Sequence, residues 1–252
     1  GFTVMDPEVG RLTGDDIGPG RFPETQAIIA NFDLVTGHKQ DLLGKKVLIT
    51  AGGTREAIDP VRFIGNRSSG KQGIALAKAA RDRGAQVHLI AANCDVADLK
   101  GIEVIEVETT SQMQSALQSQ FDQCNILIMS AAVADARPSH VAQEKIKKAS
   151  LSSIELEANP DLLAEIASRK STQILVGFAA ETKDHLQEAR RKLEAKGLDV
   201  IYVNDVSGGA IFGQDTTMGT ILIRNEADIA VKEVSKDALS NTLLDQAIRQ
   251  LG

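Results

Sequence analysis

The stretch KVLITAG at residues 46–52 decides the fold class, because a short apolar run that ends in glycine is typical of a buried strand. A polar loop follows it, and residues 70–83 then have the apolar spacing of a helix. The run QVHLIAA at residues 86–92 is the next candidate strand. The main part of the chain therefore begins with a strand, a helix and a strand.

The same alternation continues to the end of the chain. Further strands are expected at residues 102–108, 125–133, 172–180, 199–205 and 219–225, and further helices at residues 110–123, 159–170, 183–197 and 237–251. Apolar strands that alternate with helices predict an α/β fold, a doubly wound and mostly parallel sheet with helices on both faces. Ligands of such sheets bind at the carboxyl ends of the strands, here the loops at residues 51–70, 130–148, 177–182 and 204–219.

The first 45 residues have a different character. Residues 10–24, GRLTGDDIGPGRFPE, are rich in Gly and Pro, and the apolar side chains of residues 23–35 then have roughly helical spacing. We interpret residues 1–45 as the end of another domain with a linker, and residues 46–252 as one folded domain.

Composition narrows the range of functions. The chain has 252 residues, 42% of them hydrophobic, and its net charge of −6 argues against nucleic acid as the main partner. No signal peptide and no apolar run long enough to span a membrane is visible. The two cysteines, Cys94 and Cys124, show neither a zinc spacing nor a disulfide framework, so we expect buried thiols in a cytoplasmic protein.

The first ligand-side loop reads AGGTREAIDPVRFIGNRSSGKQG at residues 51–73. Gly52 and Gly53 follow the strand, where backbone N–H groups can approach a phosphate, and Ser68 and Ser69 stand where the next helix begins. A plain connection of this kind takes only about 2–6 residues, so the length of this loop favours an anion site. Neither the dinucleotide pattern G-x-G-x-x-G nor the Walker pattern occurs here.

The second loop, SAAVADARPSHVAQEKIKK at residues 130–148, begins with small residues that let a flat base or sugar lie close. Asp135 can accept a hydrogen bond from a ribose hydroxyl or help to hold a cation. The lysines of KIKK, residues 145–148, resemble a solvated charge run, but their position on the ligand side favours binding.

Lys192 and Lys196 are four residues apart and so share one face of a helix. A Glu188–Lys192 ion pair is the simpler explanation for the first of them, and a polyphosphate bound by both lysines is the alternative.

The chain offers many anion donors but no evident nucleophile. His38, His88, His140 and His185 are scattered, and none lies in a nucleophile motif. The single tyrosine, Tyr202, falls within a strand, so the Tyr-x-x-x-Lys pair of reductases is missing. Such a site favours nucleotide-driven activation, in which positioning and electrostatics carry the rate.

Several stretches within residues 46–224 resemble one family, phosphopantothenoylcysteine synthetase, the ligase part of a bacterial bifunctional protein of coenzyme A biosynthesis. They are ITAGGTREAIDPVRFIGNRSSGKQG, AAVADARP, EKIKK, NPDLL, VGFAAET, KLEAKGLD and VND, in family order. The resemblance implies a Rossmann-like fold and a ligase domain at residues 46–252. It also implies the reaction: CTP, with Mg²⁺, activates 4′-phosphopantothenate as an acyl-cytidylate, and L-cysteine then displaces CMP. Members of the family pair as homodimers.

The resemblance also implies roles for single residues. Asn66 matches the asparagine that holds the acyl-cytidylate, Arg62 an arginine on the substrate side, and Lys145 an essential lysine. The nucleotide site is expected to comprise Gly53, Ser68, Met129, Ser130, Ala131, Asp135, Lys145, Pro160, Asp161, Leu162, Leu163, Phe178, Lys192 and Lys196. No metal ligands are assigned.

Two features need separate notice. Residues 207–219, SGGAIFGQDTTMG, are expected to be a mobile cover that excludes water, although the family commonly has D-x-N where this chain has Asp215-Thr216-Thr217. GDDIGPGRFPE, residues 14–24, resembles the tail of the flavin-dependent decarboxylase domain that precedes the ligase in the fused protein. Because the rest of that domain and its cysteine are absent here, we expect neither a flavin nor decarboxylase activity of this chain.

Two other functions stay open at this point. One is an NAD(P)-dependent oxidoreductase on the same fold, which the missing glycine pattern and the missing Tyr-Lys pair oppose. The other is a nucleotide-binding module without catalysis, which Asn66 and Lys145 oppose, because a binder needs no group at an acyl phosphate.

Overall fold

The computed structural model describes residues 4–11, 13–14, 16–25, 27–29, 32, 39–148, 152–181, 185–205 and 214–251. The chain forms two compact units, Gly1–Asp41 and Leu42–Gly252. In the first, β1 (Glu8–Arg11) pairs with β2 (Ile17–Arg21) in an antiparallel hairpin, and residues 25, 27–29 and 32 are helical. Leu42 is fully buried in the core of the second unit, which therefore begins slightly before the expected boundary at residue 46.

The second unit is built on an eight-stranded sheet of order β14-β13-β12-β11-β8-β3-β6-β7. The strands from β7 to β12 in this order are parallel, which confirms the doubly wound α/β fold. They are β3 (Lys46–Gly52), β6 (Gln86–Ala92), β7 (Ile102–Val107), β8 (Ile126–Met129), β11 (Ile174–Glu181) and β12 (Val200–Asp205).

An antiparallel hairpin completes the sheet. It consists of β13 (Thr216–Ile223), which the sequence predicts, and β14 (Ile229–Ser235), which it does not. β14 is an edge strand with mostly exposed or half-buried residues, including Lys232 and Glu233, so it lacks the apolar run that marks the buried strands.

The order of the strands fixes where a ligand can bind. The chain places β6 and β7 on one side of β3, and then returns to place β8, β11 and β12 on the other side. The loops that follow β3 and β8 therefore leave the sheet at a topological switch point, where open α/β sheets bind their ligands. The backbone N–H of Ala132 donates to the carbonyl of Gly52 (2.8 Å) and joins the two loops there.

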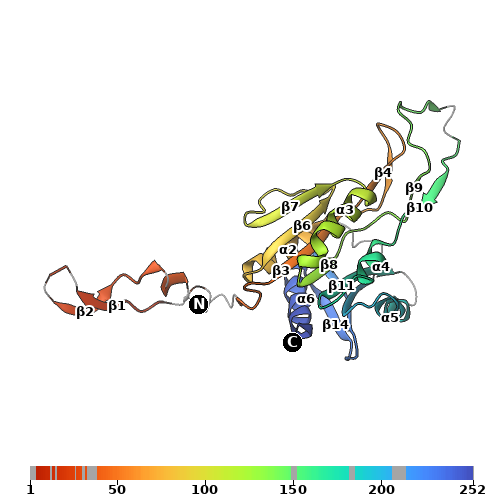
Figure 1. Ribbon diagram of the computed structural model, residues 1–252. Coiled ribbons are helices and arrows are strands. Elements are labelled where there is room, and N and C mark those ends of the chain that lie inside the picture. The colour runs from red at the N-terminus through yellow and green to blue at the C-terminus, as the bar shows by residue number, and fades with distance from the viewer. Residues whose placement is uncertain are drawn as a thin grey trace. The chain divides into compact units, whose positions relative to one another are not determined.

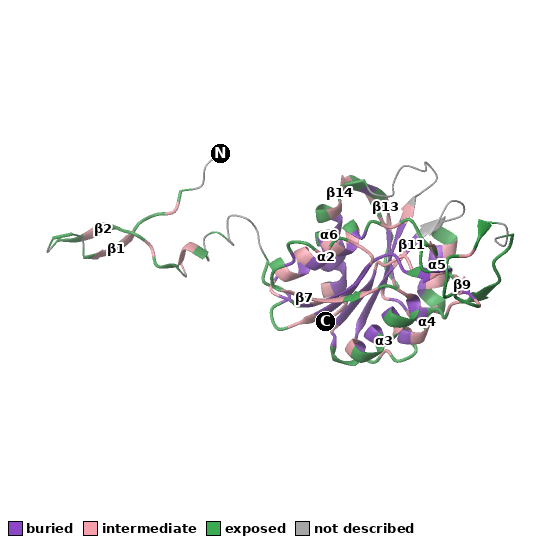
Figure 2. Ribbon diagram, turned by 90° about the horizontal axis from the view of Figure 1, so that it is seen from above, coloured by how far each residue is buried: buried purple, intermediate pink, exposed green. Residues whose placement is uncertain are grey.

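Helices cover both faces of the sheet, and the buried strands lie between them (Figure 2). α2 (Lys71–Asp82) and α6 (Lys236–Gln250) pack against one face, on the side of Val47 and Ile49. α3 (Thr110–Gln120), α4 (Leu162–Ala167) and α5 (His185–Ala195) pack against the other, on the side of Leu48. None of the helices in the described ranges has both the length and the apolar character needed to cross a lipid bilayer.

The two long ligand-side loops contain short strands that the sequence does not reveal. β4 (Arg55–Ala57) pairs with β5 (Phe63–Gly65), and β9 (Ala136–Pro138) pairs with β10 (Leu156–Ala158). We call these two hairpins and the segments at their tips the arm, which projects beyond the sheet (Figure 1). The backbone N–H of Ala142 donates to the carbonyl of Ile58 (3.0 Å) and links the two hairpins.

Candidate functional site

Two neighbouring cavities open at the switch point. The lysine cavity, of about 230 Å³, is lined by Ser68, Ser69, Gly70, Lys71, Gln72, Gly73, Ser130, Ala131, Ala132, Phe178, Ala179, Tyr202, Asn204, Thr217 and Lys236. The aspartate cavity, of about 290 Å³, is lined by Met129, Ala131, Val133, Ala134, Asp135, Asn159, Pro160, Asp161, Leu162, Leu163, Phe178 and Lys196. The two cavities share Ala131 and Phe178 in their walls, so they lie side by side.

The lysine cavity is floored by the start of α2. Gly70 takes a left-handed conformation (φ 74°), and a Cβ there would lie 2.5 Å from Cβ of Cys94. Only glycine therefore lets Ser68 and Ser69 turn into the helix at this place. The helix N-terminus carries a partial positive charge, so these residues stand where the sequence places an anion.

The backbone N–H of Gly53, which the sequence suggested as a phosphate donor, is hydrogen-bonded within the protein. It donates to the carbonyl of Ala92 (2.9 Å) and is therefore not available to a phosphate. A Cβ at this position would lie 3.1 Å from the carbonyl oxygen of Asn66 and 3.3 Å from Cβ of Ser68. Gly53 thus lets the loop that carries Asn66 and Ser68 pack closely, but it lines neither cavity.

Small residues after β8 line the cavities: Ser130, Ala131 and Ala132 line the lysine cavity, and Ala131 also lines the aspartate cavity. The hydroxyl of Ser130 donates to the carbonyl of Thr50 (2.5 Å), and the N–H of Ala131 donates to the hydroxyl of Thr50 (3.1 Å). The loop is therefore held down on β3, and a flat group can lie against it.

The aspartate cavity combines an apolar wall with carboxylates. Met129, Leu162 and Leu163 supply the wall, and Asp135 is exposed at its edge. Asp161 accepts hydrogen bonds from the N–H of Ala164 (3.0 Å), at the start of α4, and pairs with Nζ of Lys196 (2.6 Å). Burial alone raises the pKa of Asp161, but the bonds from Lys196 and the backbone outweigh it and lower the pKa below the usual value. The carboxylate therefore stays ionised.

The second helix lysine lies elsewhere. Lys196 lines the aspartate cavity, whereas Lys192 is half-buried one turn earlier and does not line either cavity. Glu188 accepts two hydrogen bonds from the guanidinium of Arg191 (2.5 and 2.9 Å), and these bonds, with the charges of Arg191 and Lys192, lower the pKa of Glu188.

An aromatic pair separates the lysine cavity from the core. The rings of Phe178 and Tyr202 meet edge to face, with 5.6 Å between their centroids. The hydroxyl of Tyr202 is 2.9 Å from that of Thr217, which also donates to Oδ1 of Asn204 (3.4 Å). Burial raises the pKa of Tyr202 and keeps it neutral. Thr217, expected in a mobile cover, is thus buried in β13; residues 207–213 of that segment lie outside the described residues.

Asn66 is exposed and lies in the loop between β5 and α2, two residues before Ser68. Its Nδ2 donates to the carbonyl of Val133 (2.9 Å), which ties the loop after β5 to the loop after β8. Asn66 does not line either cavity, but both loops that it joins do.

Arg62 and Lys145 lie on the arm, outside the walls of both cavities. The guanidinium of Arg62 pairs with the buried carboxylate of Asp59 and donates to the carbonyl of Ile146 (2.9 Å). Asp59 also accepts from the N–H of Ile146 (3.1 Å). Arg62 and Asp59 therefore form a clamp that fixes the neighbour of the exposed Lys145, and Arg62 acts in this structure through that clamp.

The Arg62 guanidinium holds the pKa of Asp59 far below its usual range, against the effect of burial and with help from backbone N–H groups. Because the folded-state pKa is the lower one, the stabilisation is complete above the unfolded-state pKa of about 4 and is lost as the pH falls below it.

We expect Asp59→Asn to lower the thermal unfolding temperature at pH 7 and to flatten its dependence on pH below about 4. The variant also replaces one carboxylate oxygen with an NH2 group, so the remaining oxygen cannot accept from both the Ile146 N–H and the N–H groups of Val61 and Arg62, and hydrogen exchange at Ile146 should become faster while exchange in β3 does not change. An exposed matched variant, Asp98→Asn, serves as the control. Unchanged exchange at Ile146 would show that the clamp does not hold this segment.

Several residues that line the cavities were not among the predicted site residues. Lys71 and Gln72 lie just inside α2, Asn204 ends β12, and Lys236 begins α6, far away in the sequence. Asn159 of the aspartate cavity stands in the quoted motif NPDLL, and its Nδ2 donates to the carbonyl of Ala134 (2.9 Å). The motif NPDLL could have identified Asn159 as a site residue, whereas no motif around Lys236 indicates a role in the site.

The prediction of buried thiols is confirmed for Cys124, whereas Cys94 is half-buried. Cys124 is buried, and burial raises the pKa of its thiol to about 12. Cys94 is half-buried beneath Gly70, and burial, with the nearby Asp95 and Glu106, also raises its pKa. Neither thiol lines the two cavities.

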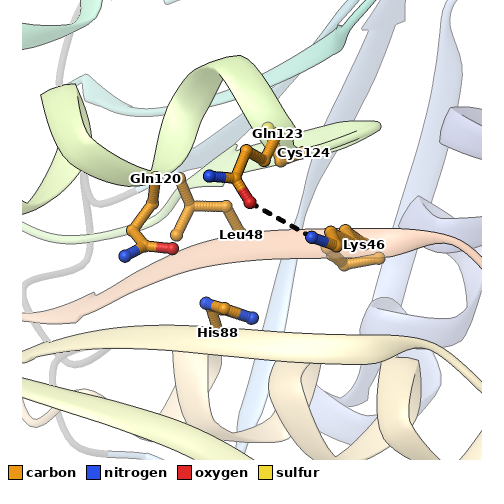
Figure 3. A pocket seen from close by; sticks show the side chains of 7 residues that line it. Lys46, Leu48, His88, Gln120, Gln123 and Cys124 are labelled. Carbon is orange, nitrogen blue, oxygen red and sulfur yellow. Dashed lines mark hydrogen bonds between the residues drawn. The ribbon is translucent and has the colours of Figure 1, made fainter.

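A third cavity lies at the opposite end of the sheet, beside the start of β3 (Figure 3). Its volume of about 10 Å³ leaves room for roughly one water molecule. Nζ of Lys46 donates to Oε1 of Gln123 there (3.2 Å), and the ring nitrogens of His88 have no hydrogen-bond partner among the described residues. It is too small for a substrate.

Within the described ranges, no three His, Cys, Asp or Glu side chains lie close enough together to hold a metal ion by themselves.

The sequence and the fold of this chain are both similar to those of known proteins. Residues 42–251 match the family described as DNA/pantothenate metabolism flavoprotein C-terminal domain. The chain is 43% identical to the coenzyme A biosynthesis bifunctional protein CoaBC of Mycolicibacterium smegmatis, over 97% of this chain and 63% of that protein. It is 42% identical to CoaBC of Bacillus subtilis, over 98% of this chain and 62% of that protein, so it spans less than two thirds of either relative.

A solved structure, the C-terminal domain of coenzyme A biosynthesis bifunctional protein CoaBC, has the same fold. It superposes with a TM-score of 0.74 at 33% identity, and the match covers 84% of this chain and 98% of that one.

Proposed function

This chain belongs to the DNA/pantothenate metabolism flavoprotein C-terminal domain family, and we propose that it is a phosphopantothenate–cysteine ligase that uses CTP. The relatives' names place them in coenzyme A biosynthesis, and the ligase is the step that the resemblance of the site motifs implies.

The observation that carries the proposal is the polarity of the two neighbouring cavities. The aspartate cavity offers an apolar wall with carboxylate acceptors, which suits a base and a ribose. The lysine cavity offers two lysines, hydroxyls and a helix N-terminus, which suit phosphates. Among the described residues, no His or Cys lines either cavity, so activation by a nucleotide fits better than a covalent enzyme intermediate.

The reaction has two steps on this site. A carboxylate oxygen of 4′-phosphopantothenate attacks the α-phosphorus of CTP, and the bond to the β-phosphate breaks and releases pyrophosphate. The amine of cysteine then attacks the acyl carbon, CMP leaves, and the amine loses a proton. We propose that Asn66 donates to the acyl phosphate, that Asp135 accepts from the ribose, and that Lys196 binds oxygens of the phosphate next to the ribose. Lys145 would reach the reacting groups from the arm that Arg62 holds.

Magnesium fits this site as an ion that enters with the nucleotide. Mg²⁺ is usually held by substrate phosphates with one or two carboxylates, and Asp135 lines the aspartate cavity without a larger acidic cluster in the described residues. When bound, the ion would offset the charge that develops on the departing pyrophosphate.

The experiment is release of pyrophosphate from CTP or ATP, with 4′-phosphopantothenate and Mg²⁺, with and without cysteine. We expect release with CTP, little with ATP, and CMP and phosphopantothenoylcysteine only when cysteine is added. No release with either nucleotide would contradict the proposal.

The arm suggests a homodimer. It exposes several apolar side chains, among them Val61 (61% exposed), Phe63 (52%), Val141 (50%) and Leu156 (50%). Arg55 stacks over the Phe63 ring at 4.6 Å, so the ring is fixed in place. We propose that a second copy of this chain covers these side chains, since isolated apolar patches of this kind mark interaction sites.

We expect Phe63→Asp to raise the dimer dissociation constant at least about tenfold, because it buries a charge in the interface. Light scattering after size-exclusion chromatography over a range of concentrations measures this. Leu43→Asp, at a site that is 73% exposed and lies off the arm, is the matched control. Equal dimerisation of both variants would show that the arm is not the interface.

We also propose that residues 1–45 are the tail and linker of a decarboxylase domain, as their resemblance implies. No flavin site is proposed for this chain.

A further inference from the structure

The first residues of two helices that are far apart in the sequence meet at the lysine cavity. Lys71 begins α2 and Lys236 begins α6, and both line the cavity. Gln72 holds the two helices together, since its Nε2 donates to Oγ of Ser240 (3.0 Å) and to the carbonyl of Lys236 (3.3 Å). The packing of the two helices therefore fixes the position of Lys236, which no sequence motif around it predicts.

The lining of this cavity carries positive charge only. Apart from the two lysines its residues are neutral, and none of the described residues that line it is an Asp or a Glu. Asp215 pairs with Nζ of Lys71 (2.6 Å) from outside the lining, where its side chain is 88% exposed. Nζ of Lys236 donates to the backbone carbonyl of Gln214, which brings no formal charge.

The two ammonium groups also repel each other. Burial lowers the pKa of Lys236, and the charge of Lys71 lowers it further, while Asp215 acts in the opposite direction. An anion in the cavity would relieve this repulsion, because opposite charges at short range favour the charged form of a lysine. The cavity therefore has room for an anion, and a bound anion would also stabilise the charged form of its two lysines.

We propose that Lys236, together with Lys71, binds a phosphoryl group in the lysine cavity. This inference rests on the proposed function, and two sources share the chemistry: the terminal phosphates of the nucleotide and the phosphate ester of the acid substrate. Lysine acts on either as a point charge. α6 thereby joins the loops of the switch point in forming the site.

Titration calorimetry tests the proposal on the full chain with inorganic pyrophosphate, CTP, CMP and 4′-phosphopantothenate as separate probes. We expect Lys236→Gln to weaken pyrophosphate and CTP at least about tenfold and CMP less than about twofold, if the group belongs to the nucleotide. If it belongs to the acid substrate, 4′-phosphopantothenate weakens instead. Lys236→Arg should restore most of the affinity, because it restores the charge, which a purely structural defect would not predict.

The matched control is Lys232→Gln, which removes the same charge from an exposed position on β14 that does not line the cavity. Circular dichroism melting checks that each variant folds. Equal affinities of the wild type and Lys236→Gln for all the probes would overturn the proposal. Because these are binding measurements, a chain that binds pyrophosphate through Lys236 but makes no product would refute the ligase and leave the phosphoryl site standing.

Discussion

Asn66→Asp should reduce formation of phosphopantothenoylcysteine at least about 100-fold, the typical cost of removing one preorganised donor from a developing anion. The asparagine amide has two N–H groups, and one of them already donates to the carbonyl of Val133 (2.9 Å). That bond fixes the side chain between the two loops of the switch point, so the other N–H is the one we expect at the acyl phosphate. A carboxylate there would repel the intermediate and lose both donors.

The measurement separates binding from chemistry. CTP affinity, from titration calorimetry, should change less than about threefold, whereas the rate in single-turnover assays should fall. Asn225→Asp is the matched control, because it adds the same charge at an exposed left-handed position (φ 59°) near the opposite end of the sheet. Full turnover by Asn66→Asp would remove Asn66 from the mechanism.

Lys196→Ala should weaken CTP binding by about 10- to 100-fold. The substitution removes the one cation among the described residues that line the aspartate cavity and leaves the ionised Asp161 without its 2.6 Å partner, so Asp135 and Asp161 together repel a triphosphate more strongly. The side chains of Lys196 and Asp161 are 25% and 50% exposed, so solvent screens part of the effect and the lower end of this range is the safer expectation.

Two further variants decide what the loss means. Arg191→Ala lies on the same helix, removes the same charge from a side chain that is 68% exposed, and should bind CTP as the wild type does. Asp161→Asn in the Lys196→Ala background should recover part of the affinity, because it removes the unpaired carboxylate. If Arg191→Ala and Lys196→Ala weaken CTP equally, net charge and not the cavity explains the effect.

The local pattern of apolar and polar residues was enough to predict the main strands of the central sheet. The apolar runs at β3, β6, β8, β11 and β12 are strong because parallel strands are buried on both faces, so no polar residue has to interrupt them. The edge strand β14 and the short strands of the arm escaped prediction for the opposite reason. Their side chains are largely exposed, and their pairing depends on neighbours that the local sequence does not specify.

Among the residues that line the cavities, the sequence predicted several in the loops that follow β3 and β8. Ser68, Ser130 and Ala131 lie at the cavities because the carboxyl ends of parallel strands meet at one edge of the sheet. Gly53 and Arg62 show the limit of such reasoning. The type of residue indicated an anion site, but in the structure the Gly53 N–H and the Arg62 guanidinium already have partners within the protein.

Only the tertiary structure decided how the site is divided and which distant residues complete it. The placing of Lys236 beside Lys71, of Asp161 beside Lys196, and of Arg62 against Asp59 and Ile146 follows from the packing of helices on the sheet and of one hairpin on another. The spacing of apolar residues in a segment indicates which face of that one helix or strand is buried. Which faces of the helices and strands pack against each other depends on the whole folded chain, and that packing forms the two charged cavities.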